Sequence, residues 1–360
     1  MSSIQNLNKP KDAFEQLEDE EGTRQGFCHI RIQQRTGRKT ITTVQGVAPE
    51  YDLKKIVRYL KKGKKEFFLL LLFRIINTFF VRTWFVPDEV FQSVEVAHKF
   101  AFGTGHLSWE WTHALRSVIH PSAIAAVFSI LSFLRLDSTQ IIVLAPRFFH
   151  AFIFSFGDFS LLKLSRRILM YRLSVFFTMF CYLLCWFVFF CAPRTLSNCL
   201  ETALILIALN WYPFNDEDFQ RRTRTWPYMS IGILTILIRP TAVLVWAPLG
   251  TWHLYRSHHK LQLLFWECLP SIFSVVLFGI VCDSLAFGHL TFSTWNFAKF
   301  NVFDGGSAHF GVHPWHWYFS QGIVSVMTVQ LLPVFFGLFA DPSLRPTLSL
   351  FYISACYFSL

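Results

Sequence analysis

The chain has 360 residues, of which 53% are hydrophobic and 18% aromatic, and its mean hydropathy is +0.38. This composition excludes an ordinary soluble domain and indicates a protein with several membrane-spanning segments. The formal net charge is +10, but residues 1–65 hold 14 of the 33 Lys and Arg residues, so the basic balance belongs mainly to an N-terminal extension.

Residues 1–65 form the first predicted part of the chain, a short soluble extension in the cytoplasm. Isoleucines that alternate with polar residues, followed by Thr36-Gly37, predict a β-hairpin over 29–46. The predicted tip of the hairpin is basic and consists of Arg35, Arg38 and Lys39. This tip fits either binding to RNA phosphate or an ordinary solvated turn. An amphipathic helix is predicted over Tyr51–Leu60, before the basic run 61–65.

An apolar run over 67–80 predicts the first membrane span, which also serves as the insertion signal because no cleavable signal peptide precedes it. Arg74 and Asn77 lie inside this run. We expect them to face other helices or water, because polar groups are costly in lipid. The basic run 61–65 places the N-terminus in the cytoplasm, and the loop 83–117 is then lumenal.

Nine further apolar segments predict an all-α polytopic membrane protein. They lie at about 118–135, 141–161, 173–192, 196–213, 227–238, 240–255, 263–287, 317–340 and 346–360. Basic connections alternate with turns at 194–198 and 239–240 and with a second lumenal loop, 289–317. Between 118 and 161 the alternation fails by one crossing, so one segment there is either re-entrant or merged with a neighbour. Asp158, an acid in this region, has no assigned side and is a site candidate.

Asp88 and Glu89 are adjacent carboxylates just after the first predicted span, in a loop rich in Trp and Phe. One interpretation is helix capping, since an amphipathic pattern follows and acidic residues favour helix N-termini. The other is catalysis by a carboxylate base. The two interpretations are compatible if Glu89 lies in the first helical turn while Asp88 faces a substrate.

Other polar residues gather in the predicted lumenal loops. Those expected to bind substrate are Glu110, Arg116, Arg194, Arg239, His313 and His316. The two histidines have no evident third ligand, and the eight cysteines follow neither zinc nor disulfide spacing, so no metal is predicted. A carboxylate base with cations suits glycosyl transfer from a lipid phosphate. It also suits a transporter with an acidic coupling site, and these residues alone do not decide between the two.

Several separated motifs carry a resemblance to a known family. They are 85–98 with Asp88-Glu89, Leu107–Trp111, Leu115–Ser117, Arg194–Asn198 with Glu201-Thr202, Ile238–Ala242 and His313–Gly322. From about residue 66 onward the chain resembles the dolichyl-phosphate-mannose-dependent mannosyltransferases of the Alg and PIG type, in the glycosyltransferase C (GT-C) superfamily. It is most similar to the branch that adds the third mannose of the GPI anchor. Residues 3–7, 29–46 and 51–57 resemble the first half of the SUI-family translation initiation factor.

The resemblance implies a GT-C-type helical bundle in the endoplasmic reticulum membrane, surrounded by membrane lipid, with a lumenal active site. The implied donor is dolichyl phosphate mannose, the acceptor is the GPI glycolipid precursor, and one inverting displacement forms an α-1,2 linkage. No cofactor or metal is implied. Asp88 is expected to take the acceptor proton, and Glu89 to orient Asp88 or the sugar. Arg194, Arg239 and His316 are expected to hold the lipid phosphate.

The chain also departs from both families. It ends at Leu360 inside an apolar run, so the bundle is expected to be C-terminally incomplete. The second half of the initiation-factor fold is missing after residue 65, and half a sheet domain cannot bury its apolar face, so ribosome binding is not expected. A fused transcript is the simplest account of this arrangement. The alternatives to a transferase are a transporter-like membrane protein and an inactive truncated or fused product.

Overall fold

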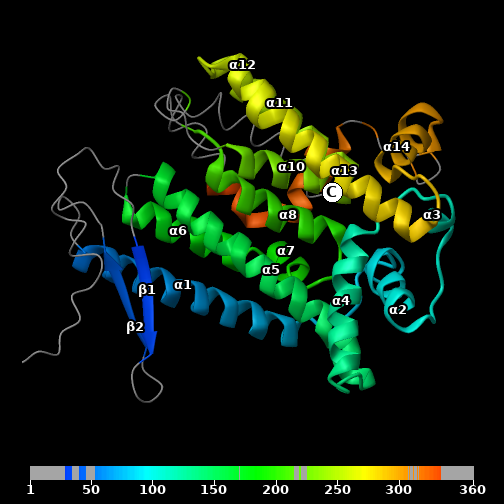
Figure 1. Cartoon of the computed structure of the whole chain (residues 1–360), viewed down its shortest axis with the longest axis horizontal. Helices are drawn as coiled ribbons and strands as arrows, with labels where there is room; N and C mark the ends of the chain where they lie inside the picture. Colours follow the sequence, from blue (N-terminus) through cyan, green and yellow to red (C-terminus); the bar gives the residue numbers. More distant parts are fainter. Residues whose placement is uncertain are drawn as a thin grey trace, which may run out of the picture. The chain divides into compact units, whose positions relative to one another are not determined.

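The structure is a computed structural model that describes residues 29–34, 40–45, 53–169, 171–214, 219, 225–306, 308, 311, 314 and 316–333 (Figure 1). The chain divides into two compact units, residues 1–65 and 66–360. The second unit contains all the residues that the sequence proposes for a site.

The first unit contains two antiparallel strands, β1 (His29–Gln34) and β2 (Thr40–Gln45). Their register places Ile30 opposite Val44 and Ile32 opposite Thr42. This pairing suits the β-branched residues of the two strands, and in β1 the isoleucines alternate with polar residues. The basic residues predicted at the tip, Arg35, Arg38 and Lys39, lie outside the described residues.

The first helix, α1 (Leu53–Phe80), is continuous over 28 residues. The sequence predicts a helix that ends at Leu60 and a separate span from residue 67, and this prediction is wrong. Lysine and glutamate are good helix formers, and the single Gly63 among them does not break the helix.

The regular elements described after α1 are all helical. Those of the first half are η2 (Val90–Val94), α2 (Glu95–Phe102), α3 (Trp109–Thr112), α4 (Ile119–Phe133), α5 (Thr139–Ile168), α6 (Arg172–Leu184), α7 (Trp186–Cys191), α8 (Ser197–Ala208) and η3 (Leu209–Trp211). Those of the second half are α10 (Trp226–Ile238), η4 (Pro240–Ala242), α11 (Val243–Arg256), α12 (Lys260–Gln262), η5 (Leu263–Cys268), α13 (Leu269–Phe287), α14 (Ser293–Ala298), η6 (Lys299–Phe303), η8 (Tyr318–Gly322), α15 (Ile323–Met327) and η9 (Thr328–Gln330).

Within the described part, two helices are long and apolar enough to cross a membrane, residues 139–168 and 260–287. The helices α4, α6 and α10 are apolar but shorter. Extended backbone at Cys185 separates α6 from α7, and at Arg239 it separates α10 from η4. The predicted segment 346–360 lies outside the described residues. The number of spans therefore stays a prediction.

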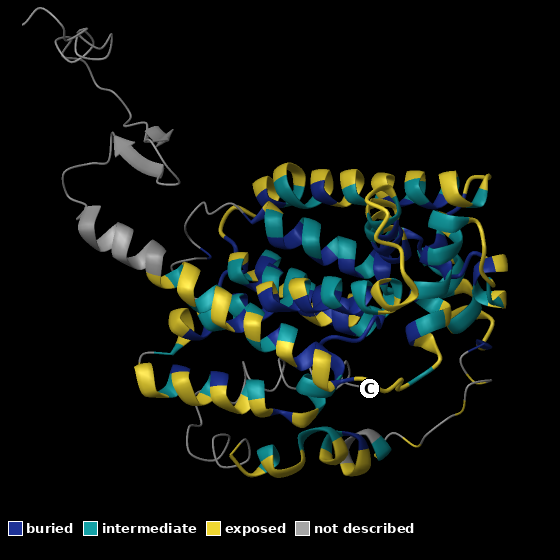
Figure 2. Cartoon of the chain, turned by 90° about the horizontal axis from the view of Figure 1, so that it is seen from below, coloured by how far each residue is buried: buried dark blue, intermediate teal, exposed yellow. Residues whose placement is uncertain are grey.

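The helices pack in a row in which α8 contacts α5 and α10, and α10 contacts α13 (Figure 1). The backbones of α5 and α8 approach closely at Gly157, where an added Cβ atom would lie 3.1 Å from the Cα atom of Ala203. Buried residues concentrate on the central helices, whereas the outer helices expose one face (Figure 2). Many large apolar side chains are exposed on these faces, as expected for helices that contact lipid.

The helices α1 and α5 are antiparallel, as three contacts along their length show. The contacts are Glu66 with Arg166, Arg74 with Asp158, and the Val81 carbonyl oxygen with Arg147. Therefore α5 begins at the end of the bundle where α1 finishes. We call this end, which carries Val81, the Val81 end.

Helix α4 begins beside the first half of α5. His120, near the start of α4, lies against His150 in the first half of α5, with 2.9 Å between the two Nε2 atoms. The chain thus runs out along α4 and back along the first part of α5. Because α5 starts at the Val81 end, α4 finishes at that end of the bundle.

Arg74 and Asp158 form a buried ion pair between α1 and α5. Nε and Nη2 of Arg74 bind the two carboxylate oxygens of Asp158 at 2.6 and 2.9 Å, and both side chains are fully buried. The Tyr182 hydroxyl also donates to Asp158 at 2.9 Å, and Asn77 donates to the Phe189 carbonyl oxygen at 2.7 Å. The prediction that Arg74 and Asn77 face other helices is therefore confirmed. Asp158 serves as the partner of Arg74.

Candidate active site

The first loop leads from α1 into the π-helical turn η2 and then into α2. Pro87 begins this turn, because its carbonyl oxygen accepts the backbone N–H groups of Val90 and Phe91 at 3.0 Å. Glu89 occupies the N-cap position, but its side chain makes no capping hydrogen bond. The Glu89 side chain has a different partner, so the capping interpretation does not hold for this residue.

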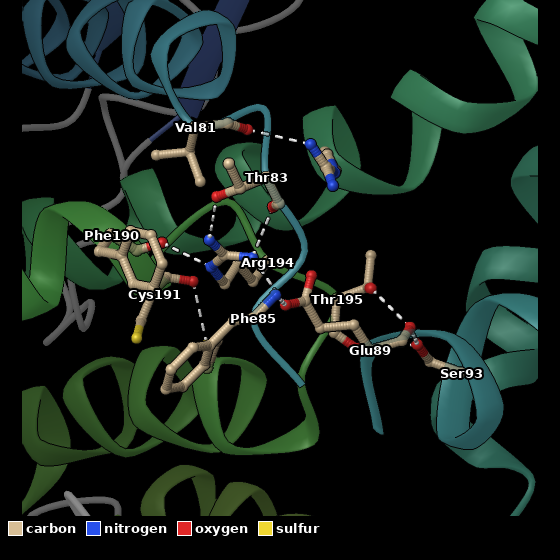
Figure 3. A network of polar contacts seen from close by, with 11 residues as sticks. Val81, Thr83, Phe85, Glu89, Ser93, Phe190, Cys191, Arg194 and Thr195 are labelled. Carbon is tan, nitrogen blue, oxygen red and sulfur yellow. Dashed lines mark hydrogen bonds and ion pairs between the residues drawn. The ribbon is translucent and has the colours of Figure 1, made fainter. Parts of the chain in front are cut away.

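Glu89 and Arg194 form an ion pair inside the protein (Figure 3). Nη1 of Arg194 lies 2.7 Å from Oε1 of Glu89, and the two side chains are 1% and 0% exposed. The backbone N–H of Phe85 donates to the same oxygen at 2.8 Å. Arg194 also donates to the carbonyl oxygens of Thr83 and Phe190. The pair therefore joins the first loop to the turn after α7.

Two hydroxyl groups fix the backbone at Glu89 (Figure 3). The Glu89 carbonyl oxygen accepts hydrogen bonds from Ser93 Oγ at 2.7 Å and from Thr195 Oγ1 at 2.8 Å. Ser93 Oγ also lies 2.8 Å from the Thr195 carbonyl oxygen. The backbone that carries Asp88 is thus held in place through its buried neighbour.

The Asp88 residue is exposed at the protein surface, whereas Glu89 is buried. Surrounding protein atoms nevertheless remove part of the water around the Asp88 carboxyl group, and this desolvation raises its pKa above the ordinary value. The charge of Glu110 also raises this pKa, whereas Arg116, Gln92 and Arg239 lower it. These influences show which charges surround Asp88. An exposed carboxylate with a raised pKa suits a general base better than a buried carboxylate that is already paired.

Arg116 and Glu110 form a bidentate ion pair near Asp88. Nε and Nη2 of Arg116 bind the Glu110 carboxylate at 3.0 and 2.9 Å. Asp283, at the end of α13, fixes the next residues, because its Oδ1 atom accepts Ser117 Oγ and the Val118 N–H at 2.9 Å each. A small pocket adjoins Arg116. Its lining includes Gln92, Arg116, His120, Ser197 and Ile238.

Arg239 and Glu201 complete the group of charges. Arg239 lies between α10 and η4, and its Nε atom is 3.5 Å from Oε2 of Glu201 on α8. Arg239 interacts electrostatically with both Asp88 and Arg116. We call Asp88, Glu110, Arg116, Glu201 and Arg239 the Asp88 cluster.

Residues 66–360 match the model of the Alg9-like mannosyltransferase family. The chain belongs to this family. It is a family of membrane glycosyltransferases, so the prediction of a helical membrane glycosyltransferase is confirmed at that level. Residues 24–64 match the translation initiation factor SUI1 model, as the N-terminal resemblance predicts. No solved structure matches the chain.

Curated proteins similar to this chain include GPI mannosyltransferases from several animals. The human GPI alpha-1,2-mannosyltransferase 3 is 38% identical over 277 residues, which cover 76% of this chain and 49% of the relative. The protein of the same name from Bos taurus is 37% identical over 273 residues, with coverage of 76% and 50%. The GPI mannosyltransferase 3 of Drosophila melanogaster is 36% identical over 272 residues, with coverage of 75% and 46%. The chain spans about half the length of the curated relatives it matches.

The two histidines predicted for the site, His313 and His316, are not part of the Asp88 cluster as the structure describes it. His316 is exposed in the turn before η8, and His313 lies outside the described residues. In the described part, no group of three or more His, Cys, Asp or Glu side chains is placed to hold a metal ion. Glu201 is absent from the site predicted from the sequence. The available signal was its position as an acid inside an apolar helix, where charged residues usually serve a site.

Proposed function

We propose that this chain carries the transfer site of a GPI mannosyltransferase, with Asp88 as its base. The donor is dolichyl phosphate mannose, and the acceptor is a GPI glycolipid that already bears mannose. Family membership and the names of the relatives support these substrate classes. One observation carries the proposal: of two adjacent carboxylates, Glu89 is buried in an ion pair, while Asp88 is exposed among the charges of the Asp88 cluster.

The reaction is a single displacement at the anomeric carbon of the donor. Asp88 takes the proton of the acceptor hydroxyl as its oxygen forms the new bond to that carbon. The bond between the anomeric carbon and the phosphate oxygen breaks, and its electron pair leaves with dolichyl phosphate. A β-linked donor then gives an α-1,2-linked third mannose. The raised pKa of Asp88 favours this role, because a stronger base accepts the proton more readily.

Arg116 is the best-supported partner for the departing phosphate. It lies near Asp88, lines the small pocket and is 23% exposed. Arginine suits a phosphate because it stays charged and donates several hydrogen bonds. Arg194 instead holds the first loop, because its donors face Glu89, Thr83 and Phe190. His313 and His316 remain candidates for contacts to the lipid phosphate.

The Val81 end of the bundle is assigned to the lumen of the endoplasmic reticulum, with the N-terminus in the cytoplasm. The antiparallel arrangement of α1 and α5 supports this assignment. It places Glu66 and Arg166 together at the opposite end, next to the basic runs 61–65 and 163–172. Positive residues favour the cytoplasmic side. The chain is then a multi-pass membrane protein whose acceptor and donor meet at the Val81 end.

The test uses cells that lack their own third-mannose transferase and express the full chain. The unchanged chain is expected to restore GPI-anchored proteins at the cell surface and mannose transfer from dolichyl phosphate mannose in isolated membranes. Asp88→Asn is expected to abolish both, because the amide cannot accept the proton. Asp137→Asn, an exposed aspartate in the turn between α4 and α5, is the matched control and should behave as the unchanged chain. Transfer by Asp88→Asn at the normal rate would remove Asp88 from the mechanism.

A further inference from the structure

Buried polar atoms without a hydrogen-bond partner concentrate in one region of the described part of the chain. Seven buried side-chain atoms of that part have no such partner, and five of them are Oε1 of Glu201, Nη1 of Arg239, Oγ1 of Thr241, Oγ of Ser293 and Oγ1 of Thr294. The other two are Oε2 of Glu89 and Oγ of Ser108. The first five lie on α8, at η4 and on α14. Nearly all buried polar groups in folded proteins have partners, so a group of unpartnered atoms indicates a place where something else binds.

These elements lie together in the fold. The side chains of Glu201 and Arg239 form the 3.5 Å contact between α8 and η4, and Thr241 is two residues further along η4. Helix α14, which carries Ser293 and Thr294, contacts both α10 and η4. Arg239 also interacts electrostatically with Asp88. The Glu201–Arg239 pair is therefore within electrostatic reach of the base of the proposed reaction.

The contact between Glu201 and Arg239 is looser than a structural ion pair. A charged N–H···O bond is normally about 2.7–2.9 Å long. The Glu89–Arg194 and Arg74–Asp158 pairs reach 2.7 and 2.6 Å. Glu201 is 2% exposed, and one of its carboxylate oxygens has no partner, as is also true of Glu89. The long contact of its other oxygen, 3.5 Å against 2.7 Å for Glu89, distinguishes Glu201. The buried carboxylate is thus held in position with an unused acceptor.

We infer that Glu201, Arg239 and Thr241 bind the hydroxyl groups of a hexose. This inference rests on the proposed function and deepens it. A carboxylate accepts hydrogen bonds from sugar hydroxyls, a guanidinium donates to their oxygens, and a threonine hydroxyl does both. An ionised phosphate offers only acceptor oxygens, so it would leave Oε1 of Glu201 without a donor, whereas a hexose hydroxyl supplies one. The hexose is the mannose of the donor or the terminal mannose of the acceptor, which share this chemistry.

Thr241→Val is the sharpest test. It preserves the shape of the side chain and removes only a hydroxyl that has no partner in the described part of the protein. The thermal midpoint should stay the same or rise, because a buried unsatisfied group disappears. Binding of mannose should weaken about threefold to tenfold. Glu201→Gln should weaken it about tenfold or more, since a charged acceptor is lost. Thr202→Val is the control for both changes. Thr202 is the exposed neighbour of Glu201, and its hydroxyl donates to the Asn198 carbonyl oxygen.

Equilibrium binding to the purified full chain in detergent is measured with three radiolabelled probes. They are dolichyl phosphate mannose, dolichyl phosphate and a mannose-terminated GPI glycan. The two variants should weaken the binding of one mannose probe and leave dolichyl phosphate unchanged. Weaker binding of dolichyl phosphate mannose assigns the atoms to the donor sugar, and weaker binding of the glycan assigns them to the acceptor.

Three results would overturn the inference. They are unchanged binding of both mannose probes in both variants, an equal loss of dolichyl phosphate, and no binding of either mannose probe by the unchanged chain. Mannose transfer by the same preparations separates this inference from the proposed function. If the unchanged chain transfers no mannose but binds a mannose probe through Glu201, the proposed function fails and the hexose site stands. If the unchanged chain transfers mannose normally and the two variants bind both mannose probes as it does, the proposed function stands and the hexose site fails.

Discussion

Replacing Glu89 should destabilise the protein, whereas replacing its neighbour Asp88 should not. Glu89→Gln leaves the Arg194 guanidinium charged and buried, with 1% of the side chain exposed. Removal of one partner of a buried ion pair costs about 3–5 kcal/mol of unfolding free energy. Asp88 is exposed, and Asp88→Asn should change that free energy by no more than about 0.5 kcal/mol.

The assay is thermal unfolding of the purified full chain in detergent, followed by tryptophan fluorescence. A loss of about 3–5 kcal/mol should lower the midpoint by at least about 5 °C. Arg194→Met should also lower it, because Glu89 and the carbonyl oxygens of Thr83 and Phe190 lose their donor. The double variant should lose less stability than the sum of the two single variants, because neither buried charge remains.

Two results would refute this reasoning. The first is a midpoint for Glu89→Gln that differs no more from the unchanged chain than that of Asp88→Asn. The second is strict additivity of the single variants, because residues that form one buried pair must couple. Transfer activity gives the converse pattern: Asp88→Asn should be folded and inactive.

The remaining predictions concern pH and the second buried pair. The rate of mannose transfer should rise with pH as Asp88 loses its proton. Arg116→Gln should move this rise to higher pH, because the charge of Arg116 lowers the pKa of Asp88. Glu110→Gln should move it to lower pH, because the charge of Glu110 raises that pKa. The pH profile of kcat/KM in membranes checks this, and shifts in the same direction would contradict it. Asp158→Asn should lower the thermal midpoint as Glu89→Gln does, because it leaves Arg74 charged and fully buried. Arg74→Met with Asp158→Leu should regain most of the loss and still transfer mannose, whereas a folded but inactive double variant would show that Asp158 has a function beyond pairing.

Part of the site follows from local sequence. The acidic pair after an apolar run, the arginines in later turns and the spaced motifs indicate a glycosyltransferase of the family that the comparison confirms. The polar residues inside the first span predict buried partners, and Arg74 has one. Each of these inferences uses residue type and position along the chain, which the sequence contains directly.

Other features depend on contacts between distant residues. Glu89 pairs with Arg194 at a separation of 105 residues, and Arg74 pairs with Asp158 at 84. Neither separation can be read from a helical period. Glu201 enters the Asp88 cluster only because α8 and α10 are packed neighbours, which brings it to Arg239.

The sequence by itself determined that this is a helical membrane protein, which family it belongs to, and that the first loop carries the adjacent carboxylates Asp88 and Glu89. These depend on composition and on short motifs, which act locally. Only the tertiary structure decided that Glu89 is buried in an ion pair, whereas its neighbour Asp88 is exposed. The physical reason is that burial and ion pairing arise when separate helices pack, so two adjacent and chemically similar side chains acquire different surroundings.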